Sequence, residues 1–189
     1  MKITGKKAKG RILAAPKSEY IRITTQKVKE SLFNILGSVE GIKFLDLFAG
    51  AGTVGIEALS RGAHPVIFVE RNAVHVRAIK RNLNQSGIDQ KCGIMATPVE
   101  KALLILASKK EEYDIIFADP PYEQGMAADL VKLLGTYNVL KRDGLLVIEH
   151  SIREECPESS IFQLTDHRRY GDTALAFFEI RELTAESGS

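Results

Sequence analysis

The residues of this chain best suited to chemistry form one run, Asp119-Pro120-Pro121-Tyr122, directly after an apolar stretch. Two prolines remove two backbone N–H donors and keep the chain extended, which leaves the Pro120 carbonyl as an acceptor. Together with the Asp119 carboxylate, that carbonyl can hold the two N–H donors of one NH2 group. The Tyr122 ring can stack on a planar ring that carries the amine. A rigid turn would explain the two prolines but not the Asp119 and Tyr122 beside them. The run therefore predicts a site that holds an aromatic amine in front of an electrophile.

A glycine turn, Gly50 to Gly55, follows the apolar stretch from Phe44 to Phe48 and has the pattern G-x-G-x-x-G. Glycines permit a tight turn and a close approach of backbone to ligand. Alone, the pattern also fits a pyrophosphate at a helix N-terminus, as in dinucleotide-binding proteins. Asp46, just before the turn, favours a ligand with a cation, such as the amino group of a methionine moiety. The same carboxylate could instead hold the backbone amides of the turn, or do both.

Glu70 ends the second apolar stretch, Pro65 to Glu70, in register with the glycine turn. An acidic residue at this place accepts hydrogen bonds from a ribose diol. Both NAD and S-adenosylmethionine contain that diol. Glu70 therefore indicates an adenosine ligand without choosing between the two.

The histidines and cysteines predict no metal site and no disulfide framework. None has metal-ligand spacing to another, and a lone histidine at a strand end is more often structural. Two distant cysteines without a C-x-x-C suit a reducing cytosol. The residues concerned are His64, His75, His150, His167, Cys92 and Cys156.

The elements that must position these residues alternate between strand and helix. Strands are predicted at Phe44–Phe48, Pro65–Glu70, Gly93–Thr97, Tyr113–Asp119 and Gly144–His150, and a hairpin at Phe162–Tyr170 and Thr173–Ile180. Helices are predicted from Thr24 or Thr25 to Gly37, from the glycine turn to Gly62, and over Asn72–Ser86, Pro98–Ser108 and Ala127–Leu134. This alternation predicts a parallel sheet with helices on both faces. Such sheets bind ligands beyond the C-terminal ends of their strands, where the residues above are placed.

The composition limits the class of protein. The 189 residues, 44% hydrophobic and 26% charged, indicate one globular domain and exclude fibrous and wholly disordered chains. The apolar runs are too short to span a membrane, and we expect no secretory signal.

Residues 1–29 carry nine basic residues and one acidic residue, whereas the whole chain has 26 basic and 24 acidic residues. We expect a basic β extension over 1–23 with a hairpin within 2–15, a main domain over 24–183 and a disordered tail over 184–189. A basic arm on an acidic body is typical of a polyanion-binding protein.

Together these residues resemble the RsmD family of class I S-adenosylmethionine-dependent methyltransferases, which act on the N2 amine of guanine in small-subunit (16S) ribosomal RNA. The similarity extends over residues 2–180. The segments that carry it are Gly5 to Arg11, Arg22 to Asn34, Asp46 to Gly52, Glu57 to Ala63, Phe68 to Glu70, Asp119 to Tyr122 and Tyr170 to Thr173. The resemblance implies an α/β fold, a Rossmann-like class I methyltransferase. Its sheet is expected to be seven-stranded and mostly parallel, with a C-terminal antiparallel hairpin and a small N-terminal β extension.

The resemblance also implies a cytoplasmic enzyme with S-adenosyl-L-methionine as cofactor. Its implied partner is ribosomal RNA, alone or within an assembling small ribosomal subunit, with no membrane and no metal. The implied catalytic residues are Asp119, Pro120, Pro121 and Tyr122. The implied cofactor-binding residues are Asp46, Phe48, Ala49, Gly50, Gly52, Thr53, Glu70, Arg71, Asn72, Thr97, Pro98 and Val99. The implied RNA-binding residues are Lys6, Lys7, Lys9, Arg11, Arg22, Thr24, Thr25 and Lys27.

Two departures from the family pattern matter. Ile23 and Gln26 replace the proline and the acid of the usual Arg-Pro-Thr-Thr-Asp. The third strand ends in Thr97-Pro98 rather than in an acidic pair, so the adenine contact is left to a backbone group or to the Thr97 hydroxyl.

Three other functions stay open on the sequence. The D-P-P-Y run also serves adenine-N6 and glutamine-amide methylation. The glycine turn and Glu70 would permit an NAD-dependent oxidoreductase. A non-catalytic RNA-binding protein could keep the same fold.

Overall fold

The computed structural model describes residues 2–5, 8, 10–11, 13, 25–88, 92–121, 125–156 and 158–181. The helices are α1 (Gln26–Leu36), α2 (Thr53–Ser60), α3 (Ala73–Ser86), α4 (Val99–Ser108) and α5 (Met126–Thr136). The strands are β1 (Phe44–Leu47), β2 (Val66–Val69), β3 (Cys92–Met95), β4 (Tyr113–Ala118), β5 (Leu140–Ser151), β6 (Phe162–Tyr170) and β7 (Thr173–Ile180).

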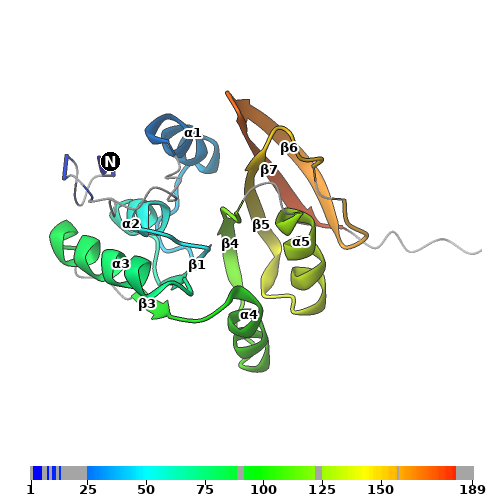
Figure 1. Ribbon diagram of the computed structural model, residues 1–189, viewed down its shortest axis with the longest axis horizontal. Helices are drawn as coiled ribbons and strands as arrows, with labels where there is room; N and C mark the ends of the chain where they lie inside the picture. Colours follow the sequence, from blue (N-terminus) through cyan, green and yellow to red (C-terminus); the bar gives the residue numbers. More distant parts are fainter. Residues whose placement is uncertain are drawn as a thin grey trace, which may run out of the picture.

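The strands form one seven-stranded sheet in the order β3-β2-β1-β4-β5-β7-β6. Strands β1 to β5 pair in parallel, whereas β7 pairs antiparallel with both β5 and β6. Figure 1 shows the sheet running from β3 at one edge to the β6–β7 hairpin at the other. The predicted α/β sheet with a C-terminal antiparallel hairpin is therefore confirmed.

Strand β5 begins at Leu140, before the predicted start at Gly144. The register explains the difference: Tyr113 pairs with Leu140, but Ile115 pairs with Leu145, so the residues between the two partners bulge out of the ladder. This bulge contains exposed polar residues. Because these residues are polar, the apolar pattern in the sequence indicates only the later part of the strand.

Alternation along the strands divides the core into two layers. Phe44 of β1 belongs to the layer that α1, α2 and α3 cover, with Leu32 and Ile56. Leu45, its neighbour, belongs to the layer under α4 and α5, with Leu103. Among the described residues, the parallel part of the sheet is thus covered by helices on both faces, and its strand ends are open for a ligand.

Caps fix where the helices begin. The Thr25 Oγ1 accepts from Val28 N (3.3 Å) at the start of α1, and the Asn72 Oδ1 accepts from Val74 N (2.8 Å) at the start of α3. Both caps match the predictions. Pro98 is the N-cap of α4, one residue outside the first helical position predicted for it.

The described part of the N-terminal extension is docked on the domain. Ile3 N donates to Arg11 O (2.9 Å) and Gly10 N donates to Ile3 O (2.9 Å), as the predicted hairpin requires. Thr4 N donates to Glu57 Oε2 of α2 (3.0 Å), and that oxygen lies 3.0 Å from Lys29 Nζ of α1, with both side chains fully buried. The domain boundary at residue 24 stays a prediction, and residues 184–189 lie outside the described residues. In the part of the chain that the structure describes, every helix is too short or too polar to cross a membrane.

Candidate active site

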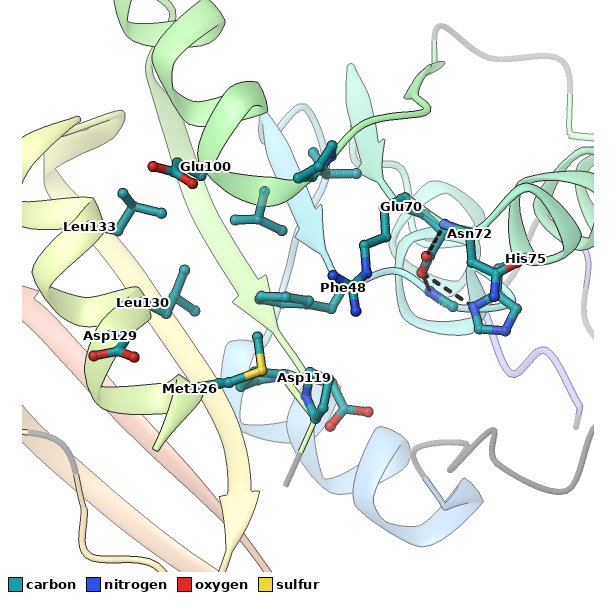
Figure 2. Close-up of a pocket in the computed structure, with 17 residues that line it drawn as sticks. Phe48, Glu70, Asn72, His75, Glu100, Asp119, Met126, Asp129, Leu130 and Leu133 are labelled. Atoms are coloured by element: carbon teal, nitrogen blue, oxygen red, sulfur yellow. Dashed lines mark hydrogen bonds and ion pairs between the residues drawn. The ribbon is translucent and has the colours of Figure 1, made fainter. Parts of the chain in front are cut away.

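A pocket of about 720 Å³ opens beyond the C-terminal ends of β1, β2 and β4. Strand β1 pairs with β2 on one side and with β4 on the other, so the chain reverses its direction of winding here. Ligands of open α/β sheets bind at such a point. The lining residues are Phe48, Gly50, Val69, Glu70, Arg71, Asn72, His75, Pro98, Val99, Glu100, Asp119, Pro120, Pro121, Met126, Asp129, Leu130 and Leu133; Figure 2 shows them.

The first wall is the turn after β1. Phe48 has a positive φ of 56°, a conformation that side chains other than glycine rarely adopt. This strained backbone carries the phenyl ring into the pocket, between β4 and Glu70 (Figure 2). Glycines at 50 and 52, with φ of 55° and 75°, complete the turn without strain. The turn therefore gives the ligand an aromatic surface and exposed backbone.

Asp46 lies beneath this turn and not on the pocket wall. Its side chain is 2% exposed, and its Oδ2 accepts from Gly55 N (2.9 Å) in α2. Burial raises the pKa of Asp46 to about 7; the bond from Gly55 lowers it and the nearby charge of Glu70 raises it. The structure thus shows the amide-holding role of Asp46, and its contact with a cationic ligand stays a prediction.

Glu70 joins the turn to the start of α3. Its Oε2 accepts from Gly50 N (2.9 Å), and its Oε1 accepts from Asn72 N (2.7 Å). His75 Nδ1 lies 3.5 Å from Oε2 (Figure 2). These bonds hold the carboxylate at the pocket wall, where it can accept hydrogen bonds from a ligand diol.

The corner after β4 forms the opposite wall. Asp119, Pro120 and Pro121 all line the pocket, and Asp119 N donates to Leu47 O of β1 (3.5 Å). Tyr122 lies outside the described residues. The corner therefore places a carboxylate and a segment without N–H donors on the same cavity as Glu70, as the sequence predicted.

Helices α4 and α5 close the third side. Pro98, Val99 and Glu100 come from the start of α4, whereas Thr97 is not among the lining residues. The Thr97 hydroxyl, which the sequence offered for adenine, therefore has no place on this wall. Glu100 supplies a carboxylate on the side facing Leu133 of α5 (Figure 2).

The pocket gathers most of the predicted cofactor-binding residues and leaves out five. Phe48, Gly50, Glu70, Arg71, Asn72, Pro98 and Val99 line it, and Asp46, Ala49, Gly52, Thr53 and Thr97 do not. Sequence reasoning missed His75, Glu100 and the α5 side chains. A signal existed for His75, because the third residue after a cap at Asn72 lies in the first turn of a helix that starts at the ligand edge.

The predicted RNA-binding residues are less completely described. Arg11 Nη1 donates to Gln85 O of α3 (3.0 Å), and Thr25 caps α1. Lys27 lies on α1 and is exposed. The others, Lys6, Lys7, Lys9, Arg22 and Thr24, lie outside the described residues.

A parallel sheet that ends in an antiparallel strand inserted between β5 and β6 is the sheet of class I methyltransferases, and the pocket lies at the strand ends, where such sheets bind ligands. Comparisons with known proteins agree. A sequence model of the family described as "Conserved hypothetical protein 95" matches residues 1–179, and the chain belongs to this family. This confirms the resemblance to the RsmD family and makes the chain a methyltransferase, not an NAD-dependent oxidoreductase.

Individual relatives cover nearly the whole chain. The "Putative rRNA methyltransferase YlbH" of Bacillus subtilis (strain 168) is 37% identical over 183 residues, which are 96% of this chain and 100% of the relative. "Ribosomal RNA small subunit methyltransferase D" of Escherichia coli (strain K12) is 33% identical over 158 residues, 83% of this chain and 78% of the relative. The solved structure of "Putative methyltransferase yhhF from Escherichia coli" superposes with a TM-score of 0.81 at 26% identity and covers 96% of this chain and 98% of that one.

Proposed function

We propose that this chain transfers a methyl group from S-adenosyl-L-methionine to the exocyclic N2 amine of a guanine in small-subunit ribosomal RNA. One observation carries the proposal: Asp119 and Pro120 lie on the wall of the same pocket as Glu70. The relatives named as ribosomal RNA methyltransferases support RNA as the substrate. The proposed site of action is the bacterial cytoplasm, where ribosomal RNA is made.

The pocket fits this cofactor. Its volume of about 720 Å³ lies in the usual range for ligands of that size, roughly 300–1,000 Å³. Glu70 would hold the ribose diol, Phe48 and Val99 would contact the adenine, and the turn after β1 would hold the methionine end. When bound, S-adenosyl-L-methionine supplies a methyl group on a positively charged sulfur, which is already electrophilic.

The Asp119 corner would position the accepting amine. The nitrogen lone pair of a guanine amine is delocalised into the ring, so the free amine is a poor nucleophile. Hydrogen bonds from its two N–H groups to the Asp119 carboxylate and the Pro120 carbonyl would localise that pair on nitrogen. Orientation of this kind can contribute on the order of 7–11 kcal/mol to catalysis. The base must first leave its stack to reach the pocket.

The adenine amine needs an acceptor in place of the acidic pair that the third strand lacks. We assign this role to the start of α4, where Glu100 and the backbone from Pro98 line the pocket.

The decisive test is Asp119→Ala, assayed with small-subunit ribosomal RNA both naked and in isolated small subunits. We expect methyl transfer to fall at least about 100-fold, since removal of one precisely oriented active-site hydrogen bond has an effect of that order. Binding of S-adenosyl-L-methionine and of RNA should change less than about threefold. Asp143→Asn is the matched control: Asp143 is an exposed residue in the bulge of β5 and does not line the pocket, so this variant should retain activity. Unchanged turnover in Asp119→Ala would remove the proposed role of the corner.

The product of the same assay identifies the acceptor. Nucleoside mass spectrometry should give N2-methylguanosine. A product of N6-methyladenosine, or a methylated glutamine amide in a protein substrate, would keep the methyl transfer and overturn the guanine assignment.

A further inference from the structure

Three side chains that are distant in the sequence meet beside the C-terminal hairpin. They are His150 near the end of β5, Cys156 in the segment after it, and His167 of β6. One ligand atom of each lies within 4.8 Å of those of the other two. None of the three lines the active-site pocket, so the methyl-transfer site does not account for them.

The sheet brings the two histidines together across β7. His150 pairs with Ala174 of β7, and His167 pairs with Ala176. Paired residues in neighbouring strands point to the same face, so both rings stand on one side of β7. The two alanines leave space there, and the rings stack across it with centroids 5.3 Å apart and planes 24° apart.

Hydrogen bonding orients the buried ring. The His150 Nδ1 lies 2.9 Å from the Ser151 carbonyl oxygen, which can only accept, so the proton is on Nδ1. The lone pair is then on Nε2, which faces His167 Nε2 at 3.1 Å. A histidine whose second nitrogen donates to a backbone carbonyl is the usual arrangement of a metal ligand.

We propose that His150, Cys156 and His167 bind one zinc ion. With Zn–N of about 2.0–2.1 Å and tetrahedral angles, two nitrogens on one ion are about 3.4 Å apart, close to the observed separation. The Cys156 sulfur binds as a thiolate and releases its proton to solvent on binding. Water takes the fourth position. The ion joins the segment between β5 and β6 to the hairpin.

The test uses the full-length protein, stripped of metal with a chelator and then titrated with Zn²⁺. We expect one tightly bound ion per chain. Cys156→Ser and His167→Ala should each weaken zinc binding at least about 100-fold. Loss of a residue that only hydrogen-bonds to a metal ligand typically weakens binding about 10–100-fold, and loss of the ligand itself has a larger effect. Cys92→Ser is the matched control: Cys92 is an exposed cysteine on β3 and should leave zinc binding unchanged.

Co²⁺ provides a second readout that does not depend on affinity. The wild type and Cys92→Ser should show a thiolate-to-cobalt charge-transfer band, and Cys156→Ser should lack it. Absence of stoichiometric zinc in the wild type would mean that the histidines only bond to each other, and this would overturn the proposal. Zinc binding that persists in Cys156→Ser, or that depends on Cys92, would overturn it as well.

Discussion

The Glu70 carboxylate joins two parts of the pocket wall. Its two oxygens each accept from a backbone N–H, Gly50 on one side and Asn72 on the other. A glutamine in its place has one acceptor oxygen, and its NH2 would face a backbone donor. The proposed ribose contact and the shape of the turn after β1 therefore depend on the same carboxylate.

Replacement of Glu70 by Gln should lower the affinity for S-adenosyl-L-methionine by about 10- to 100-fold. The reason is the loss of charge-assisted hydrogen bonds, worth roughly 1.5–3 kcal/mol each. Isothermal titration calorimetry measures the effect, with Glu112→Gln, an exposed residue before β4, as the control. An unchanged dissociation constant in Glu70→Gln would show that this carboxylate does not bind the cofactor.

Asp46 makes stability depend on pH. Its pKa is raised from 3.8 to about 7, so the folded protein binds a proton that the unfolded chain has released between these values. The contribution of Asp46 is fully present below about pH 4 and is lost as pH rises through 7. The full shift corresponds to on the order of 4 kcal/mol.

Asp46→Asn removes this titration and keeps an acceptor for Gly55. We expect the free energy of unfolding of the wild type to fall relative to Asp46→Asn between pH 4 and pH 8. Urea unfolding at a series of pH values measures the difference, and Asp129→Asn serves as the exposed control. If the difference between wild type and Asp46→Asn is independent of pH, Asp46 titrates normally in the folded protein.

The site residues that could be predicted from the sequence are those that form a recognisable short motif directly after a predicted strand. The glycine turn, Glu70 and the Asp119 corner each follow an apolar strand, and the structure places all three on one pocket. The α5 side chains were missed, because Met126 and Leu130 look like ordinary core residues of an amphipathic helix. Nothing in their spacing indicates that this part of α5 faces a cavity.

At the scale of elements, the contact of α2 with β1 and β2 fixes the glycine turn. A Cβ on Gly55 would lie 2.3 Å from Phe68 Cε1 and 2.9 Å from Asp46 Oδ2. Phe68 is fully buried, so its ring has no space to move. Glycine at 55 therefore lets α2 begin close to the sheet and bond to Asp46.

Gly55→Ala should destabilise the protein by about 1–3 kcal/mol through overpacking and should weaken cofactor binding. Gly135→Ala is the matched control in α5. Its Cβ would meet the terminal methyl of the exposed Ile161 at 2.8 Å, and the gain in helix propensity should leave stability equal or higher. Urea denaturation and calorimetry compare the two. Equal effects of the two substitutions would contradict the packing argument.

Elements also explain an approach at the C-terminal hairpin that the sequence does not predict. His150 and His167 are far apart in the chain, and spacing along the chain reveals side chains that meet only when they share one turn or one helix. Their approach arises from strand order, with β7 inserted between β5 and β6. The order of strands depends on long-range packing, which local patterns do not encode.

At the scale of the whole molecule, two of the described N-terminal charges hold elements of the protein together. Lys29 is fully buried against Glu57, and burial lowers its pKa, although Glu57 opposes that effect. This lysine fastens α1 to α2 and is not available to RNA. Arg11 is bonded to Gln85 O at the end of α3. The described part of the extension is thus attached to the domain by apolar residues and by Arg11. Lys6, Lys7 and Lys9 lie outside the described residues, and their contact with phosphates stays a prediction.

Neutralisation of these three lysines tests the arm without removing Ile3, Ala8 and Leu13, which are part of the core. For Lys6, Lys7 and Lys9 all changed to Gln, we expect weaker RNA binding and a smaller salt dependence. The slope of log K against log salt concentration should decrease by about 2–3, since each phosphate contact contributes roughly 0.7–0.9. The control changes three exposed lysines at the other face of the sheet, Lys101, Lys109 and Lys110, to Gln. It removes the same net charge, so equal slopes in the two variants would assign RNA affinity to overall charge and not to the arm.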